Sequence, residues 1–197
     1  LGNHEHYNCV FQSTKKSLED SFEKLGLNKI KILDNDTVRY HDVNIIGSTL
    51  WSDFEKANPI SMANVQRGMN DYRIIYDKDP YYSITAQFTL DEHYRSVQYI
   101  KNVLKEDKDG QYVVMTHHGP TYKSLNTEHV GNGLDGGYCS DMSELILDNP
   151  NIKFWISGHT HIIKKYEVGT TKVLANCRGY YGEQSYKWWK GLTHFQI

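Results

Sequence analysis

Two stretches of the chain place apolar residues at helical spacing. In residues 14–25 these residues recur three or four positions apart, with Ser13 placed to cap the helix and Gly26 to end it. Residues 89–107 give the strongest helical pattern, beginning at a Thr89 cap with a capping-box spacing. Its expected buried face consists of Tyr94, Val97, Ile100 and Leu104.

Strands are predicted by short apolar or alternating runs. Residues 111–116 (QYVVMT) and 152–157 (IKFWIS) are continuous apolar runs that indicate buried strands. Residues 37–51 predict a hairpin with its turn near His41-Asp42. Further short strands are expected at residues 29–33 (KIKIL), 162–169, 171–177 and 192–197.

Residues 52–82 lack a regular pattern. They are polar, rich in tyrosine and interrupted by Pro59 and Pro80, which predicts a long loop with one short helix. Loops of that length are uncommon in compact domains and are usually functional, so we expect Tyr72 and Arg73 near the mouth of a site. Another helix is expected after a glycine-rich segment, with Ser140 as its cap.

The order of elements predicts a single layered α/β or α+β domain over residues 1–197. A net charge of −2 gives no basic field for nucleic acid, and the short apolar runs give no membrane span. Cys9, Cys139 and Cys177 are widely spaced and form no CxxC pair, which indicates reduced thiols and a cytoplasmic location. Residues 186–191 (YKWWKG) mix aromatic and basic side chains; we favour packing of the tryptophans over stacking on bases.

Histidines follow both buried strands. His117 and His118 come directly after residues 111–116, and His159 and His161 come after residues 152–157. Open α/β sheets bind ligands beyond the carboxyl ends of their strands, and histidines two apart in extended backbone face the same side. A G-H-x-H string arises by chance in roughly four such chains in a hundred, so a solvated loop is the weaker interpretation.

The segment Gly2-Asn3-His4-Glu5 carries a second signal of the same kind. Chance produces this string in well under roughly one chain in a hundred. Asn3 offers a neutral amide oxygen and His4 an imidazole that titrates near working pH. A polar turn at a helix start is the alternative.

The motifs GNHE, THHGP and GHTH, in this order, resemble those of the calcineurin-like metallophosphoesterase superfamily. GSTLWSDF, MNDYR and NCRGY also resemble connecting segments of its bacterial and phage members. The resemblance covers essentially the whole chain. It implies a four-layer sandwich in which two packed β-sheets are flanked by helices.

The resemblance also implies residue roles. The implied metal ligands are Asn3, His117 and His159 for the second ion and His161 for the first. His4 would be catalytic, stabilising the phosphoryl oxygens or protonating the leaving group, and Glu5 would orient its neighbours.

Two assignments stay open at this point. We favour His117 over His118 as the ligand, because His117 follows the strand directly and adjacent residues face opposite ways. His118 would then lie behind the ligands or touch substrate. Arg178 would pair with a substrate phosphate or make a structural hydrogen bond.

The implied reaction is hydrolysis of a phosphomonoester or phosphodiester by a hydroxide that bridges two divalent metal ions. Manganese is the first expectation for the ions, with zinc or iron next. The substrate would be a phosphoester small molecule or a nucleotide. The alternatives are a non-catalytic interaction scaffold on the same fold and a nuclease, which the net charge disfavours.

The family pattern begins with D-x-H and G-D-x-x-D, and neither motif stands before GNHE here. Residues 91–93 (Asp-Glu-His) match the first string but fall in the expected first turn of a helix, where capping is the better interpretation. We therefore expect the N-terminal strands to be absent from this chain. A fragment, a split gene and a degenerate protein would each explain that, in this order of preference.

Overall fold

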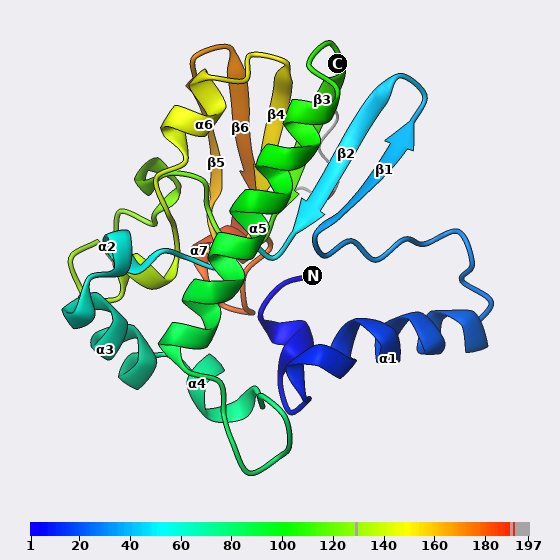
Figure 1. Cartoon of the computed structure of the whole chain (residues 1–197). Coiled ribbons are helices and arrows are strands. Elements are labelled where there is room, and N and C mark those ends of the chain that lie inside the picture. The colour runs from blue at the N-terminus through cyan, green and yellow to red at the C-terminus, as the bar shows by residue number, and fades with distance from the viewer. Residues whose placement is uncertain (129, 190, 192–197) are drawn as a thin grey trace.

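The computed structural model describes residues 1–128, 130–189 and 191. Six strands of these residues form one mixed sheet in the order β1-β2-β3-β4-β6-β5 (Figure 1). The four central strands run parallel, and an antiparallel hairpin partner closes each edge. The strands are β1 (Asp36–Tyr40), β2 (Val43–Ser48), β3 (Gln111–Thr116), β4 (Ile152–Ser157), β5 (Ile163–Val168) and β6 (Thr171–Asn176).

The two apolar runs are strands with the predicted bounds, at β3 and β4. The hairpin is confirmed as well, since Tyr40 pairs with Val43 and leaves His41-Asp42 as a two-residue turn. Within that turn His41 has φ 54°, the left-handed backbone that such turns require. The strands expected at residues 162–169 and 171–177 are present as β5 and β6. The strand expected at residues 192–197 lies outside the described residues.

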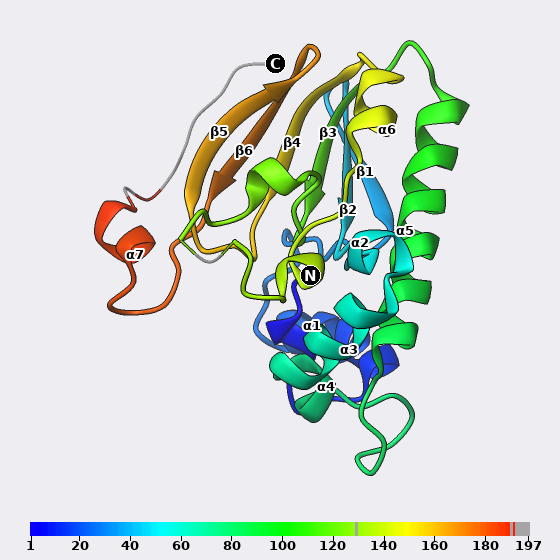
Figure 2. The same cartoon turned by 90° about the vertical axis from the view of Figure 1, so that its left-hand side faces the viewer.

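Helices pack against one face of the sheet and beneath its strand ends. Figure 2 shows α5 and α6 along one face of the sheet, with α1, α3 and α4 gathered below it. The helices are α1 (Phe11–Lys24), α2 (Phe54–Ala57), α3 (Pro59–Gly68), α4 (Asp71–Ile74), α5 (Ala86–Glu106), α6 (Ser143–Leu147) and α7 (Gln184–Trp188), with 3₁₀ turns at His4–His6, Tyr122–Ser124 and Asp135–Gly137.

Three predicted helix caps are wrong. The helix α1 begins at Phe11, so Ser13 lies inside it and donates to the Val10 carbonyl at 2.8 Å. The helix α5 begins one turn early, because Thr85 rather than Thr89 accepts from a backbone amide. Ser140 does not cap α6; its hydroxyl accepts from the backbone nitrogen of Asp53.

The face of α5 also differs in one position from the prediction. Ile100 and Leu104 are buried, and Val97 packs against the same cluster, whereas Tyr94 is 52% exposed. The earlier helix start brings Leu90 and His93 into the interior instead, and Nδ1 of His93 lies 3.0 Å from the Leu50 carbonyl. Residues 91–93 therefore belong to the helix.

The prediction of a strand at residues 29–33 is wrong. Residue 29 lies in a turn, and residues 30–33 have no regular secondary structure. The loop prediction for residues 52–82 is wrong in part, because α2, α3 and α4 fall within it. Asn58 caps α3 and Pro59 occupies its first turn, a combination that favours the start of a helix. The same residue types are common in turns, so the sequence pattern did not predict this helix. The segment α2 has left-handed backbone, with φ of 50–64° at residues 54–57.

The main core lies between the sheet and helices α5 and α6. Trp155 of β4 is fully buried and donates through Nε1 to the Thr116 hydroxyl at 2.9 Å. Ile46, Ile100 and Tyr112 pack in the same cluster. Two smaller clusters, around Phe54 and around Trp51, fill the space beneath the strand ends.

The described residues form one sheet, and the second sheet of the expected sandwich is not made by them. Across the same residues, no helix combines the length and the apolar character that crossing a membrane requires. The packing of the tryptophans expected at residues 186–191 is wrong for Trp188, which is 68% exposed.

Truncating the buried tryptophan should test this core. Trp155→Ala should lower the free energy of unfolding by about 3–5 kcal/mol, because it removes a large buried side chain and the hydrogen bond that this side chain donates to the Thr116 hydroxyl. Urea denaturation followed by circular dichroism measures this. The exposed Trp188→Ala is the matched control and should change stability by less than about 0.5 kcal/mol.

Candidate metal centre

Backbone hydrogen bonds continue the parallel ladder beyond the ends of three strands. The nitrogen of His117 donates to the Ser48 carbonyl at 3.2 Å, and that of Gly158 donates to the His117 carbonyl at 3.0 Å. The residues after β2, β3 and β4 therefore stay in register as they leave the sheet. This places the THHGP and GHTH segments side by side.

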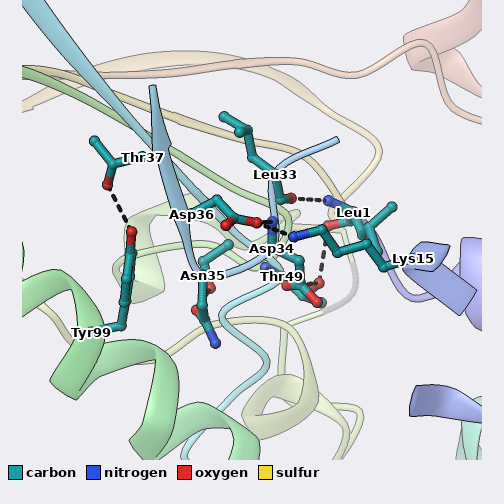
Figure 3. A network of polar contacts seen from close by, with 10 residues as sticks. Leu1, Lys15, Leu33, Asp34, Asn35, Asp36, Thr37, Thr49 and Tyr99 are labelled. Carbon is teal, nitrogen blue, oxygen red and sulfur yellow. Dashed lines mark hydrogen bonds and ion pairs between the residues drawn. The ribbon is translucent and has the colours of Figure 1, made fainter. Parts of the chain in front are cut away.

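Leu1, which directly precedes GNHE, is held against the same strand ends by polar contacts (Figure 3). The Leu1 nitrogen donates to the Leu33 carbonyl at 2.9 Å, and the Thr49 hydroxyl lies 3.2 Å from the Leu1 carbonyl. That hydroxyl also lies 3.1 Å from Oδ1 of Asp34. Nearby, Lys15 of α1 pairs with Asp36. These bonds fix the chain just before Asn3.

Asn3, His117 and His159 converge. Oδ1 of Asn3 lies 2.8 Å from Nε2 of His117, and the same nitrogen lies 3.1 Å from Nδ1 of His159. A Cβ at Gly2 would lie 2.6 Å from Nδ1 of His117, so only glycine lets this imidazole approach so closely. Glu5 accepts from the Gly2 nitrogen at 2.6 Å, which steadies the turn.

Burial keeps the two imidazoles uncharged. Desolvation, helped by the neighbouring histidines, holds the pKa values of His117 and His159 well below the usual 6.5. Near neutral pH both rings therefore carry lone pairs rather than positive charge. A neutral imidazole is the form that binds a metal ion.

The three converging atoms fit a divalent metal ion. Ligand atoms about 2.0–2.2 Å from such an ion lie about 3–3.5 Å from one another, close to the separations seen here. Nε2 of His159 is buried without a hydrogen-bond partner. Among the described residues no three His, Cys, Asp or Glu side chains form a metal-binding group. The candidate ligand set therefore needs the amide oxygen of Asn3 in addition to the imidazoles of His117 and His159.

His161 and His4 lie at the rim of this cluster. Nδ1 of His161 is 3.0 Å from the carboxylate of Glu183, and Nε2 of His4 is 3.1 Å from the Tyr180 hydroxyl. His159 and His161 have φ of 59° and 49°, a left-handed backbone that is strained for residues other than glycine. Such strain is concentrated at functional sites.

The remaining two candidates, His118 and Arg178, do not converge with Asn3, His117 and His159 on the same point. His118 is buried, bonds the Thr49 carbonyl through Nδ1 at 3.1 Å and packs beside His159. Its burial favours a position behind the candidate ligands, and a contact with substrate stays a prediction. The guanidinium of Arg178 lies over the Tyr186 ring at 5.6 Å, and its pairing with a phosphate also stays a prediction.

A pocket of about 700 Å³ opens beside the cluster. Asn3, His4, His159 and His161 line it, together with Tyr7, Tyr138 and Tyr180. Its acidic residues are Asp71, Glu128, Asp135 and Glu183, and among the described lining residues there is no lysine or arginine.

Sequence reasoning missed two of these carboxylates as parts of the site. Asp71 belongs to the MNDYR segment, in which we expected Tyr72 and Arg73 at the mouth; Tyr72 instead bonds Thr89 at 3.0 Å. Glu183 follows NCRGY in the sequence, and only the folding of the chain brings it to the pocket. In the sequence, the only signal for either residue is its position within or just after the segments MNDYR and NCRGY.

Comparison with known proteins agrees with this geometry. The model of the family described as calcineurin-like phosphoesterase matches residues 1–162. The chain belongs to the calcineurin-like phosphoesterase family. The match spans all three motifs that suggested it.

Two individual proteins are similar to this chain, one in sequence and one in structure. The chain is 28% identical over 200 residues to the uncharacterized protein L509 of Acanthamoeba polyphaga mimivirus, covering 93% of this chain and 68% of that protein. The crystal structure of the phosphopantetheinyl hydrolase of Mycobacterium tuberculosis superposes with a TM-score of 0.66 at 14% identity, over 96% of this chain and 70% of the other. That likeness confirms the predicted α/β calcineurin-like fold class.

Acid should destabilise the fold through a histidine behind the site. His6 is buried, stacks on Phe11 at 4.3 Å, and desolvation lowers its pKa to about 4. The unfolded chain binds this proton first, so the contribution is complete above pH 6.5 and is lost as the pH falls toward 4.

Between pH 7 and pH 5, His6 alone should account for about 2 kcal/mol of lost unfolding free energy. His6→Phe keeps an aromatic ring against Phe11 and should reduce the loss by that amount, as measured by urea denaturation at the two pH values. Equal losses in variant and wild type would contradict the assignment.

Proposed function

We propose that this chain hydrolyses a phosphomonoester or phosphodiester with the help of two divalent metal ions. The observation that carries the proposal is the convergence of Asn3 Oδ1, His117 Nε2 and His159 Nδ1 on one point beside the pocket. Family membership supports the reaction class.

Asn3, His117 and His159 would hold one ion, and His161 would contribute to the other. Bound there, divalent ions supply Lewis-acid polarisation of phosphoryl oxygens and activation of water. Manganese is our first choice, and zinc or iron suits the same mixture of imidazole nitrogen and amide oxygen.

The charge of the pocket supports metal dependence. A phosphate group needs positive charge around it, and the described lining residues include four carboxylates without a lysine or arginine. Bound cations would reverse this negative field and leave room for a phosphoester. The same acidic lining disfavours nucleic acid, whose binding depends on basic side chains.

The position of His4 supports a role on the substrate rather than as a metal ligand. It is exposed at the pocket, and its Nε2 lies against the Tyr180 hydroxyl rather than the Asn3–His117–His159 cluster. We assign to this nitrogen the stabilisation of phosphoryl oxygens or the delivery of a proton to the leaving group. Tyr180 would orient the ring.

Removing a proposed ligand should remove metal and activity together. Asn3→Ala or His159→Ala should abolish tight manganese binding and lower turnover of p-nitrophenyl phosphate and its bis ester by at least about 100-fold. Metal content after dialysis and initial rates in Mn²⁺ measure the two effects.

The exposed turn residue His41 offers a matched control, because His41→Asn removes an imidazole far from the cluster and tolerates the left-handed backbone. It should retain metal and rate. Unchanged activity in Asn3→Ala would overturn the site assignment, and absence of bound metal in the wild type would favour the scaffold alternative.

His4 should separate chemistry from metal binding. His4→Ala should retain the wild-type metal content while lowering kcat by about 10²–10⁴-fold, the usual contribution of a positioned acid or base. Metal analysis and steady-state kinetics on the same preparation give both numbers. Loss of metal from this variant would make His4 a ligand instead.

A further inference from the structure

Asp71 carries a buried carboxylate directly behind Asn3. It is 2% exposed, and its Oδ1 accepts from Nδ2 of Asn3 at 2.6 Å. Its Oδ2 lies 3.4 Å from the Tyr7 hydroxyl. The two partners flank the 3₁₀ turn at His4–His6, so one carboxylate from α4 contacts both ends of that turn.

The chemistry of these groups decides which way the Asn3 amide faces. An ionised carboxylate only accepts hydrogen bonds, so it selects the NH₂ end of the amide. The carbonyl end is then directed away from Asp71, toward Nε2 of His117 at 2.8 Å. Without Asp71, the amide could rotate and present two N–H donors to the point where a cation would bind.

Burial makes this selection strong. A hydrogen bond to a charged acceptor is stronger than one between neutral groups, and both Asn3 and Asp71 are shielded from water. An amide turned the other way would place its oxygen against the carboxylate, leaving both acceptors without a donor. Negative charge behind the amide also polarises it and makes Oδ1 a better ligand.

We propose that Asp71 is a positioning residue that fixes the Asn3 side chain with its oxygen toward the metal. This rests on the proposed function, since it presumes that Asn3 is a ligand. The role acts through Asn3, and the contact with Tyr7 holds the carboxylate in place from the other side.

The first test measures Mn²⁺ affinity of the full chain by the electron paramagnetic resonance signal of free Mn²⁺. Asp71→Ala should weaken binding about 10–100-fold, the usual effect of removing a group that orients a ligand. Glu128→Ala removes an equal charge from the pocket wall without contacting Asn3, and should weaken binding less than about 3-fold. Wild-type affinity in Asp71→Ala, alongside lost affinity in Asn3→Ala, would overturn the inference and leave the proposed function standing.

A pair of reciprocal variants separates positioning from general support of the fold. Asn3→Asp alone places two carboxylates together and should bind Mn²⁺ at least about 10-fold more weakly than wild type. Adding Asp71→Asn to that variant supplies a donor for the new carboxylate, and should restore affinity to within about 5-fold of wild type.

Thermal unfolding by circular dichroism shows which variants are folded. If Asp71→Ala does not fold, the comparison between Asn3→Asp and the double variant decides. Failure of the double variant to regain affinity would overturn the positioning role. Absence of Mn²⁺ binding in the wild type would instead refute the proposed function on which it rests.

Discussion

The site depends on parallel strand register that persists past the ends of the strands. Because His117 and Gly158 extend the ladder beyond the sheet, the loops after β3 and β4 cannot diverge before their histidines are placed. Only then can a third segment, from the other end of the sequence, bring Asn3 to within 2.8 Å of His117. The convergence is a property of backbone pairing first and of side chains second.

Electrostatics then give this arrangement its chemical character. Two imidazoles whose pKa values are held low by burial face one another without charge repulsion. Carboxylates surround them at greater range, from Asp71 behind Asn3 to Glu183 beside His161. A neutral inner set within an acidic wall attracts cations and repels bare phosphate.

Much of the fold was predictable because its signals are local. The strands β3 and β4 follow from apolar runs, and the β1–β2 turn follows from two residues between alternating segments. The start of α5 was not predictable, because Thr85 and Thr89 can both cap, and the packing of Ala86 and Leu90 with Phe54 and Val65 favours the earlier start. The run at 29–33 has strand composition, yet pairing needs a neighbour that the described fold does not give it.

The site was predictable to the extent that its residues form motifs. Asn3, His117 and His159 stand in recognisable strings, and their approach to one another follows from strand ends meeting at one edge. Asp71 and Glu183 stand in no such string. They reach the site through loop paths that depend on the packing of α3, α4 and the chain after β6, and no periodicity encodes that. The left-handed backbone at His159 and His161 has a related consequence. Glycine would relax the loop at either position, so thermal stability and the proposed metal binding favour different amino acids there.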